Sequence, residues 1–247
     1  MVDIYLTDKI IINSNKYYYD ENNERKIINN KNWHKILSDI GWIKLDKSWI
    51  IRLNHMSNEK GNSKWGVLDV IPDGDCFYSV IAEAYNYYYK TIESPIILDS
   101  SDIRKEISLQ ITEKNFEHIM NIYKIEKSMN EFYHKWNIED IKSFKDLREE
   151  LKKTGHNYWA DHIIIQLFQE KYNMNIIILN QSNLKKNTKI YSLGNELNKE
   201  KNTIIMYYID QMHFKLIGYF NNNSIHTIFN YNELPNEIIK IYELDCR

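Results

Sequence analysis

The sequence predicts an α+β protein, and three patterns indicate this class. Apolar residues recur at helical spacing after residue 76, across much of 96–151 and again near 164–172. A short continuous apolar run at 176–179 then suits a buried central strand. Two β-prone segments, 203–209 and 214–220, follow near the end of the chain as neighbouring strands. Helices that precede a run of antiparallel strands are typical of a small central sheet flanked by helices.

The composition describes a folded protein with no general attraction to polyanions. The 247 residues are 43% hydrophobic and 27% charged, and the formal net charge is −2. Such a balance favours neither nucleic acid nor an acidic membrane surface as a partner. No segment approaches the roughly 20 apolar residues of a membrane span, and the start of the chain lacks a signal-peptide pattern. We therefore expect a soluble, intracellular protein with no membrane or nucleic-acid partner.

The first 60 residues carry no motif to which chemistry can be attached. Segments 4–12 and 17–28 have the pattern of two strands around a polar turn. Residues 32–40 then fit a short helix, which Gly41 ends in a left-handed conformation. We expect residues 1–60 to form an N-terminal extension that packs on or beside a domain of residues 61–247.

A cysteine follows two β-prone pieces, 49–53 and 65–71, which are separated by a polar run. The second piece leads into Pro72-Asp73-Gly74-Asp75-Cys76-Phe77-Tyr78-Ser79. Apolar residues then recur at helical spacing, at Val80, Ile81, Ala84, Tyr85 and Tyr88. Cys76 is therefore predicted to lie at the N-terminus of a helix.

That position suits a nucleophile. Unpaired N–H groups and the positive end of the helix dipole stabilise a thiolate, so we expect a lowered pKa for Cys76. Gly74 permits a positive φ, which lets successive N–H groups face one concavity able to hold an oxyanion. The alternative is that Cys76 is a small buried apolar residue with a packing role alone.

Metal and nucleotide sites have no support in the sequence. The turn Asp73-Gly74-Asp75 suggests a calcium loop, but Ile71 and Val80 would then occupy ligand positions, and neither can bind the ion. No cysteine pair, His-Glu-x-x-His pattern or Walker-type Gly-Lys-Ser occurs either. We expect no metal and no cofactor. The two cysteines, Cys76 and Cys246, predict no disulfide framework.

One histidine is placed for catalysis. His213 lies at the edge of the predicted strand 214–220, from which its side chain can reach a cleft. Six other residues could take part in a site, but each is more readily explained by packing or local structure, or has no apparent partner in the sequence. They are His118, His134, Trp159, His162, His226 and Cys246.

Three separated stretches together resemble the ovarian tumour (OTU) family of cysteine proteases, which are deubiquitinating enzymes. They are the stretch from Pro72 to Ser79, the block Trp159-Ala160-Asp161-His162-Ile163 through Gln166, and His213-Phe214-Lys215-Leu216-Ile217. Their order and their setting on helices and strands agree with the family over about residues 65–220. The resemblance implies a papain-type cysteine protease fold.

The resemblance also implies roles for individual residues. Cys76 would be the nucleophile, His213 the general base, and Asp73 the aspartate whose loop builds the oxyanion pocket. Many members carry Asp or Asn two residues after the histidine to orient its ring, whereas this chain has Lys215, which cannot accept from an imidazole N–H. The orienting group would then come from elsewhere, with Asp73, Asp210 and Gln211 as candidates.

The implied activity is that of a deubiquitinase, a thiol-dependent hydrolase of the bond after the C-terminal Gly of ubiquitin, which needs no cofactor. Ubiquitin, polyubiquitin chains and ubiquitinated proteins would be its partners. Two alternatives stay open: an inactive ubiquitin-binding module, and a cysteine protease for another ubiquitin-like modifier. The abundance of residues with AT-rich codons fits a parasite, an endosymbiont or a large DNA virus, and for a virus the expected location is the host cytoplasm.

Overall fold

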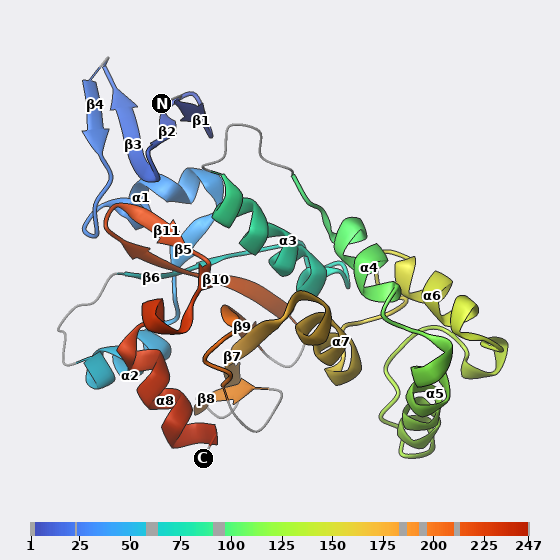
Figure 1. The fold of residues 1–247 in the computed structure, drawn as a ribbon. Coiled ribbons are helices and arrows are strands. Elements are labelled where there is room, and N and C mark those ends of the chain that lie inside the picture. The colour runs from blue at the N-terminus through green and yellow to red at the C-terminus, as the bar shows by residue number, and fades with distance from the viewer. Residues whose placement is uncertain are drawn as a thin grey trace.

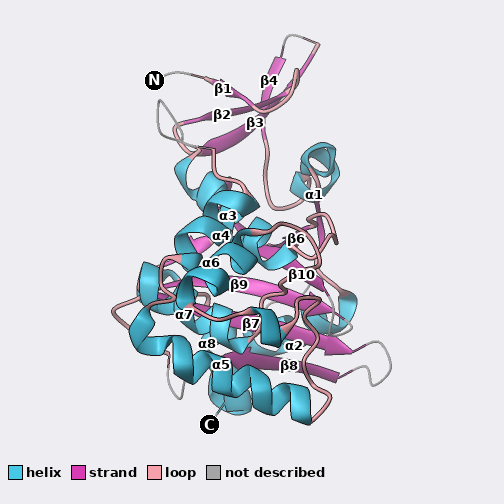
Figure 2. Ribbon diagram, turned by 90° about the vertical axis from the view of Figure 1, so that its right-hand side faces the viewer, coloured by secondary structure: helices cyan, strands magenta, loops and turns pink. Residues whose placement is uncertain are grey.

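The computed structural model describes residues 3–22, 24–57, 64–90, 97–182, 187–192, 197–209 and 213–246. An eight-stranded mixed sheet runs through the centre of the molecule and carries helices on both faces (Figure 1). A second, four-stranded sheet near the N-terminus stands apart from it (Figure 2). The α+β class predicted from the sequence is confirmed.

The central sheet combines segments from both halves of the chain. Its main strands, in spatial order, are β5 (Trp42–Lys44), β6 (Trp65–Leu68), β10 (His213–Asn221), β9 (Asn202–Ile209), β7 (Met174–Ser182) and β8 (Asn187–Ser192). The short strands β11 (Ser224–His226) and β12 (Ile228–Phe229) pair with β10 and β9. Only the pair β7 and β9 is parallel among these described strands. The predicted antiparallel pairing of β9 with β10 is confirmed.

Both faces of this sheet are buried, and alternate residues of one strand enter different cores. In β9, Ile204 and Met206 face the first core, whereas Ile205 and Tyr207 face the second. The same alternation holds for β7. A strand that is covered on both sides has no polar face, which explains the continuous apolar runs in the sequence.

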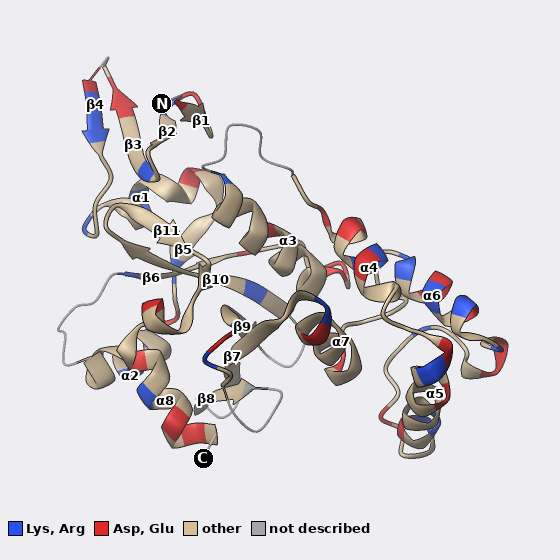
Figure 3. Cartoon of the chain, in the orientation of Figure 1, with Lys and Arg blue, Asp and Glu red and all other residues tan. Residues whose placement is uncertain are grey.

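Helices cover the two faces unequally. The first core includes residues of α3 (Cys76–Tyr89), α4 (Ser100–Ser108), α5 (Glu113–Ser128), α6 (Phe144–Lys152) and α7 (His162–Tyr172). The second lies under α2 (Lys47–Ser57) and α8 (Asn236–Cys246). Single 3₁₀ turns are η1 (Leu37–Ile40), η2 (Ile138–Asp140) and η3 (Tyr231–Glu233). Charged residues are frequent along the outer helices α4, α5 and α6, while the central strands carry few (Figure 3).

The N-terminal residues form four strands where the sequence predicted two. They are β1 (Ile4–Tyr5), β2 (Ile10–Asn13), β3 (Lys16–Glu21) and β4 (Glu24–Ile27), in a simple meander. The predicted helix is present as α1 (Trp33–Ile36) continued by η1, and Gly41 ends it with a φ of +90° as expected. Strand β5 then joins the central sheet beside β6.

Two glycines allow this N-terminal part to pack closely on the central sheet. Gly66 and Gly218 are paired across β6 and β10. A Cβ on Gly66 would lie 2.4 Å from the Trp33 ring, and one on Gly218 would lie 2.3 Å from the Trp42 ring. The two indole rings are fully buried. The missing side chains therefore create the space that the tryptophans fill.

One secondary-structure prediction is wrong. Residues 49–53 were expected to be extended, but they lie within the helix α2. Trp49 and Leu53 are both fully buried and are four residues apart, so they share one helical face, and packing of that face outweighs the β-preference of the Trp-Ile-Ile sequence. Within the described residues, no helix has both the length and the apolar character needed to cross a bilayer.

Candidate active site

Gly74 shapes the turn before Cys76. Its φ is +91°, and a Cβ there would lie 2.7 Å from both the carbonyl carbon and the carbonyl oxygen of Gly155. Only glycine fits this close approach of two backbone segments. The Asp73 carboxylate accepts a hydrogen bond from the Asp75 N–H at 3.0 Å, which closes the turn. Cys76 is thereby the first residue of α3, as the sequence predicted.

A buried arginine, which the sequence analysis did not identify, anchors this turn. Arg104 is fully buried, and its Nε donates to Asp75 Oδ1 at 2.6 Å. The other Asp75 oxygen accepts from the Gly155 N–H at 2.8 Å. Arg104 also donates to the carbonyls of Leu151 at 3.0 Å and Tyr158 at 2.9 Å. The guanidinium thus ties the cysteine turn to the end of α6 and to the segment that follows it.

The thiol of Cys76 occupies a largely enclosed position, with 7% of the residue exposed. Burial raises its pKa, and this effect exceeds the opposing hydrogen bonds from the backbone of Phe214 and Phe77. The expected lowering of the Cys76 pKa is therefore wrong, because desolvation of the thiolate outweighs the helix N-terminus. The protonated thiol is the main form near neutral pH, and its attack on a carbonyl needs a base.

The start of α3 packs against the start of β10, where the predicted base lies. The backbone of Phe214 lies close enough to the Cys76 thiol to oppose the rise of its pKa. The rings of Phe77 and Phe214 meet edge to face with their centroids 5.6 Å apart. Residue 214 follows His213 directly. The fold therefore brings the cysteine and the histidine to one place, although 137 positions separate them in the sequence.

His213 is held by a carboxylate from the segment between β6 and the cysteine turn. Its Nε2 lies 2.8 Å from Asp69 Oδ1, and Lys215 Nζ donates to Asp69 Oδ2 at 2.7 Å. Partial burial raises the pKa of Asp69, but the hydrogen bonds from Lys215 and His213 more than offset this and leave the pKa below its usual value. Asp69 is therefore ionised at neutral pH.

The Asp69 contact fixes the tautomer of the imidazole. An ionised carboxylate can only accept, so Nε2 of His213 carries the proton and donates. In the neutral ring, Nδ1 then keeps a free lone pair. This nitrogen is buried and has no hydrogen-bond partner among the residues that the structure describes. A base with one nitrogen oriented and the other available is the arrangement that thiol activation requires.

The orienting group is thus Asp69, which is not one of the three candidates from the sequence. The carboxylate of Asp73 serves the turn at Asp75, and Asp210 and Gln211 lie outside the described residues. Leu68 pairs with Leu216 across β6 and β10, and one further step of this register places Asp69 opposite Lys215. The available signal was a single carboxylate within the otherwise apolar segment 65–71.

The family follows from a comparison with known proteins. The model of the family described as OTU-like cysteine protease matches residues 71–214, more than half of the chain. The chain belongs to this family. The matched range begins just before the cysteine turn and ends one residue after His213, so it contains Cys76 and His213, while Asp69 precedes it.

The family match confirms the OTU-like fold that the resemblance implied. Solved OTU structures are similar to this chain at low sequence identity and with TM-scores below 0.5. An OTU domain solved in complex with ubiquitin is 17% identical, with a TM-score of 0.44 over 74% of this chain and 86% of that one. An OTU deubiquitinase from Wolbachia pipientis wMel, bound to ubiquitin, is 10% identical, with a TM-score of 0.42 over 69% and 98%. The Hazara virus OTU bound to ubiquitin is 11% identical, with a TM-score of 0.40 over 64% and 83%. A search of curated proteins finds no match.

The second OTU block leads into α7. Asp161 caps this helix, since its Oδ1 accepts from the Ile164 N–H at 2.9 Å. Its Oδ2 accepts from Tyr123 Oη at 2.9 Å and lies 3.0 Å from His134 Nε2. The indole of Trp159 donates to the His156 carbonyl at 3.0 Å. The expected packing of His134 agrees with these contacts, whereas Trp159 is only partly buried and makes a local contact.

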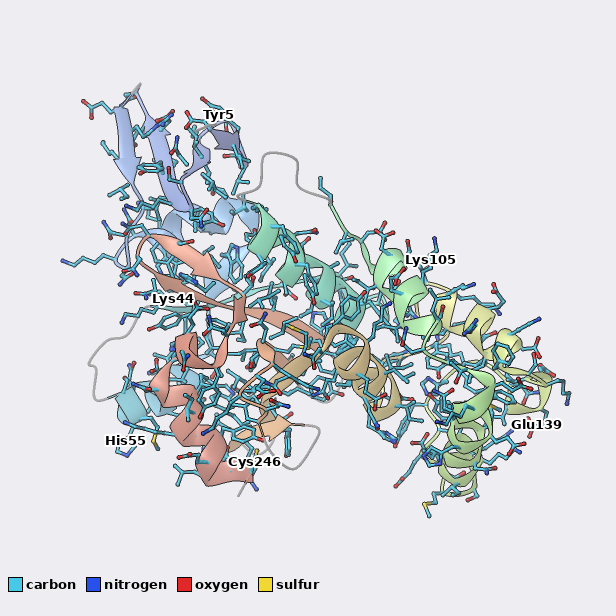
Figure 4. The ribbon with its side chains drawn as sticks, viewed as in Figure 1. Tyr5, Lys44, His55, Lys105, Glu139 and Cys246 are labelled. Carbon is cyan, nitrogen blue, oxygen red and sulfur yellow. The ribbon has the colours of Figure 1, made fainter. Side chains whose placement is uncertain are left out.

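The remaining sequence candidates lie outside this arrangement. His162 is half exposed, with Nδ1 3.8 Å from a Glu126 oxygen. Nε2 of His226 is buried with no hydrogen-bond partner among the described residues. Cys246, labelled at the end of α8 in Figure 4, donates through its sulfur to the Ile190 carbonyl at 3.6 Å. Neither cysteine forms a disulfide.

A cleft of about 570 Å³ adjoins the site on the side of Asp69. Its polar lining includes the carboxylates of Asp69, Asp73, Glu83 and Asp99, together with the amine of Lys90. Burial raises the pKa of Glu83 and lowers that of Lys90 to about 8. Across the described part of the chain, no group of three or more potential ligands is placed to hold a metal ion.

Proposed function

We propose that this OTU-family protein is a deubiquitinase that hydrolyses the bond after the C-terminal Gly of ubiquitin. Ubiquitin, polyubiquitin chains and ubiquitinated proteins are its proposed partners. The observation that carries the proposal is the state of His213: Asp69 orients Nε2, while Nδ1 has no hydrogen-bond partner among the described residues. His213 begins the strand β10, which packs against the start of α3 at Cys76. Membership of a cysteine protease family supports the same chemistry.

The reaction follows from this geometry. His213 Nδ1 accepts the thiol proton as the Cys76 sulfur attacks the carbonyl of the isopeptide bond, and Asp69 stabilises the imidazolium that forms. The imidazolium then protonates the amine of the substrate lysine, which leaves as the thioester forms. In the second half, His213 takes a proton from water, and the resulting hydroxide attacks the thioester carbonyl. The C–S bond breaks, the imidazolium returns its proton to the sulfur, and free ubiquitin and the Cys76 thiol are released.

We assign Asp73 a supporting role in the oxyanion site. Its carboxylate holds the Asp75 N–H at 3.0 Å and so fixes the turn whose backbone N–H groups precede Cys76. Because the Asp75 N–H is used by Asp73, the N–H groups of Gly74 and Cys76 are the proposed donors to the oxyanion, at about 3 kcal/mol for each donor. No cofactor enters this scheme.

Labelling by a ubiquitin probe with a C-terminal electrophile tests the proposal. We expect the full chain to form a covalent adduct and to cleave a fluorogenic ubiquitin C-terminal amide, and Cys76→Ala to abolish both. Cys246→Ala is the matched control, because its sulfur lies at the end of α8, and it should leave both signals intact. Labelling that persists in Cys76→Ala would assign the chemistry to another residue.

A second candidate function is that of an inactive ubiquitin-binding module. The raised pKa and burial of Cys76 favour it, since both reduce the reactive thiolate. Tight ubiquitin binding without labelling or cleavage would support this function. Parallel probes built on other ubiquitin-like modifiers distinguish a protease with a different substrate.

We also propose that residues 1–60 act as an extension of a protease domain formed by residues 61–247. Packing of Trp33 and Trp42 onto Gly66 and Gly218 supports an extension that braces the central sheet. Deletion of the extension should then lower the melting temperature of the chain. An unchanged melting temperature would exclude a bracing role.

A further inference from the structure

Lys215 lies beside the His213–Asp69 pair. Residues 213 and 215 are two positions apart on β10, so their side chains point to the same face of the sheet. The Lys215 side chain is only 18% exposed, and its Nζ donates to Asp69 Oδ2 at 2.7 Å. The lysine therefore contacts the carboxylate that orients the histidine, through the oxygen that the histidine does not use.

Asp69 has little support from its own segment. It follows the last residue of β6, in a stretch without regular structure that leads to the cysteine turn. Its side chain is 51% exposed. A half-exposed carboxylate on an irregular segment has several rotamers available. Two contacts, one on each oxygen, fix both the position and the plane of the carboxylate.

We propose that Lys215 is a positioning residue that holds Asp69 in the orientation in which Oδ1 accepts from His213 Nε2. The inference rests on the proposed function, because it assigns Lys215 a part in the activation of Cys76. Lys215 acts through Asp69 and has no contact with the reacting atoms in this scheme. It therefore stabilises the tautomer and the ring orientation that leave Nδ1 free to accept the thiol proton.

A double-variant cycle tests this dependence. In the natural background, we expect Lys215→Met to lower kcat by about tenfold with little change in KM, because positioning errors affect the chemical step. In an Asp69→Ala background, which is already slow, the same substitution should change kcat less than about twofold. Lys215→Arg keeps a cationic donor and should recover most of the lost rate.

Two controls separate positioning from loss of structure. Lys127 Nζ donates to both oxygens of Glu139 at 2.9 and 2.8 Å, at an exposed site on α5, so Lys127→Met removes a similar ion pair elsewhere. It should leave kcat unchanged. Lys215→Gln removes the charge but keeps a polar side chain of moderate length. If Lys215→Met does not fold, Lys215→Gln takes its place in the cycle.

A second readout is independent of ubiquitin. Alkylation of Cys76 by iodoacetamide, quantified by peptide mass mapping in the full chain, should show the same cycle as kcat. If ubiquitin is not cleaved but the alkylation cycle holds, the proposed substrate is wrong and the role of Lys215 stands. The inference would be overturned if Lys215→Met lowered kcat by the same factor with Asp69 and with Ala at position 69. A change in KM alone, or an unchanged kcat when Lys215→Met is the only substitution, would also overturn it.

Discussion

Arg104 is expected to be the most stabilising single side chain around the cysteine turn. Arg104→Met removes the partner of Asp75, whose residue is only 4% exposed, and leaves the carbonyls of Leu151 and Tyr158 without this donor. Removing one partner of a buried ion pair costs about 3–5 kcal/mol, and an unsatisfied buried carbonyl costs about 1–3 kcal/mol. These costs overlap, so we expect a loss of about 4–6 kcal/mol in the free energy of unfolding.

Urea unfolding followed by tryptophan fluorescence measures this loss as the product of midpoint and slope. Arg148→Met is the matched control, because Arg148 donates to the carbonyls of Ile111 at 2.6 Å and Leu109 at 3.0 Å, and we expect it to cost about 1 kcal/mol. If Arg104→Met prevents folding, Arg104→Lys retains the charge and permits the measurement.

The pairing itself is tested by adding Asp75→Asn. Because the neutral amide has no charge to be compensated, the double variant with Arg104→Met should be about 2 kcal/mol more stable than the sum of the two single losses predicts. The reasoning would be refuted if the losses of Arg104→Met and Asp75→Asn were strictly additive, or if Arg104→Met and Arg148→Met lost the same stability.

Three further predictions concern the site. Gly74→Ala should destabilise the chain by about 2 kcal/mol more than Gly155→Ala in urea unfolding. Both residues have positive φ, but an added Cβ lies 2.7 Å from backbone atoms at position 74 and 3.7 Å from its nearest neighbour at position 155. Equal losses of stability would contradict this prediction. Asp69→Ala should lower kcat by about 10²-fold and Asp73→Ala by less, as measured with a fluorogenic ubiquitin amide; the reverse order would show that Asp69 does not orient the base. Burial raises the pKa of Cys76, so the thiol is protonated at low pH and becomes reactive as pH rises. The rate of iodoacetamide labelling should therefore increase with pH, with a midpoint above the value of about 8.5 for an ordinary thiol. A labelling rate that is flat between about pH 6 and pH 8 would indicate a preformed thiolate.

The sequence by itself determined the local features of the site. Gly74 adopts the positive φ that the turn pattern predicts, and Cys76 begins the helix that the apolar spacing indicates. Gly41 ends its helix as expected. These features depend on residues that are near neighbours in the chain, and for such residues backbone sterics and apolar periodicity act directly.

Only the tertiary structure decided how the site is completed. Asp69 reaches His213 across 144 positions, and Arg104 reaches Asp75 across 29, and neither contact leaves a periodic signal. The pKa of Cys76 was predicted in the wrong direction for the same reason, because the burial that raises it comes from the packing of α3 against β10. Local chemistry specifies the elements, whereas desolvation and long-range pairing depend on which elements the folded chain brings together.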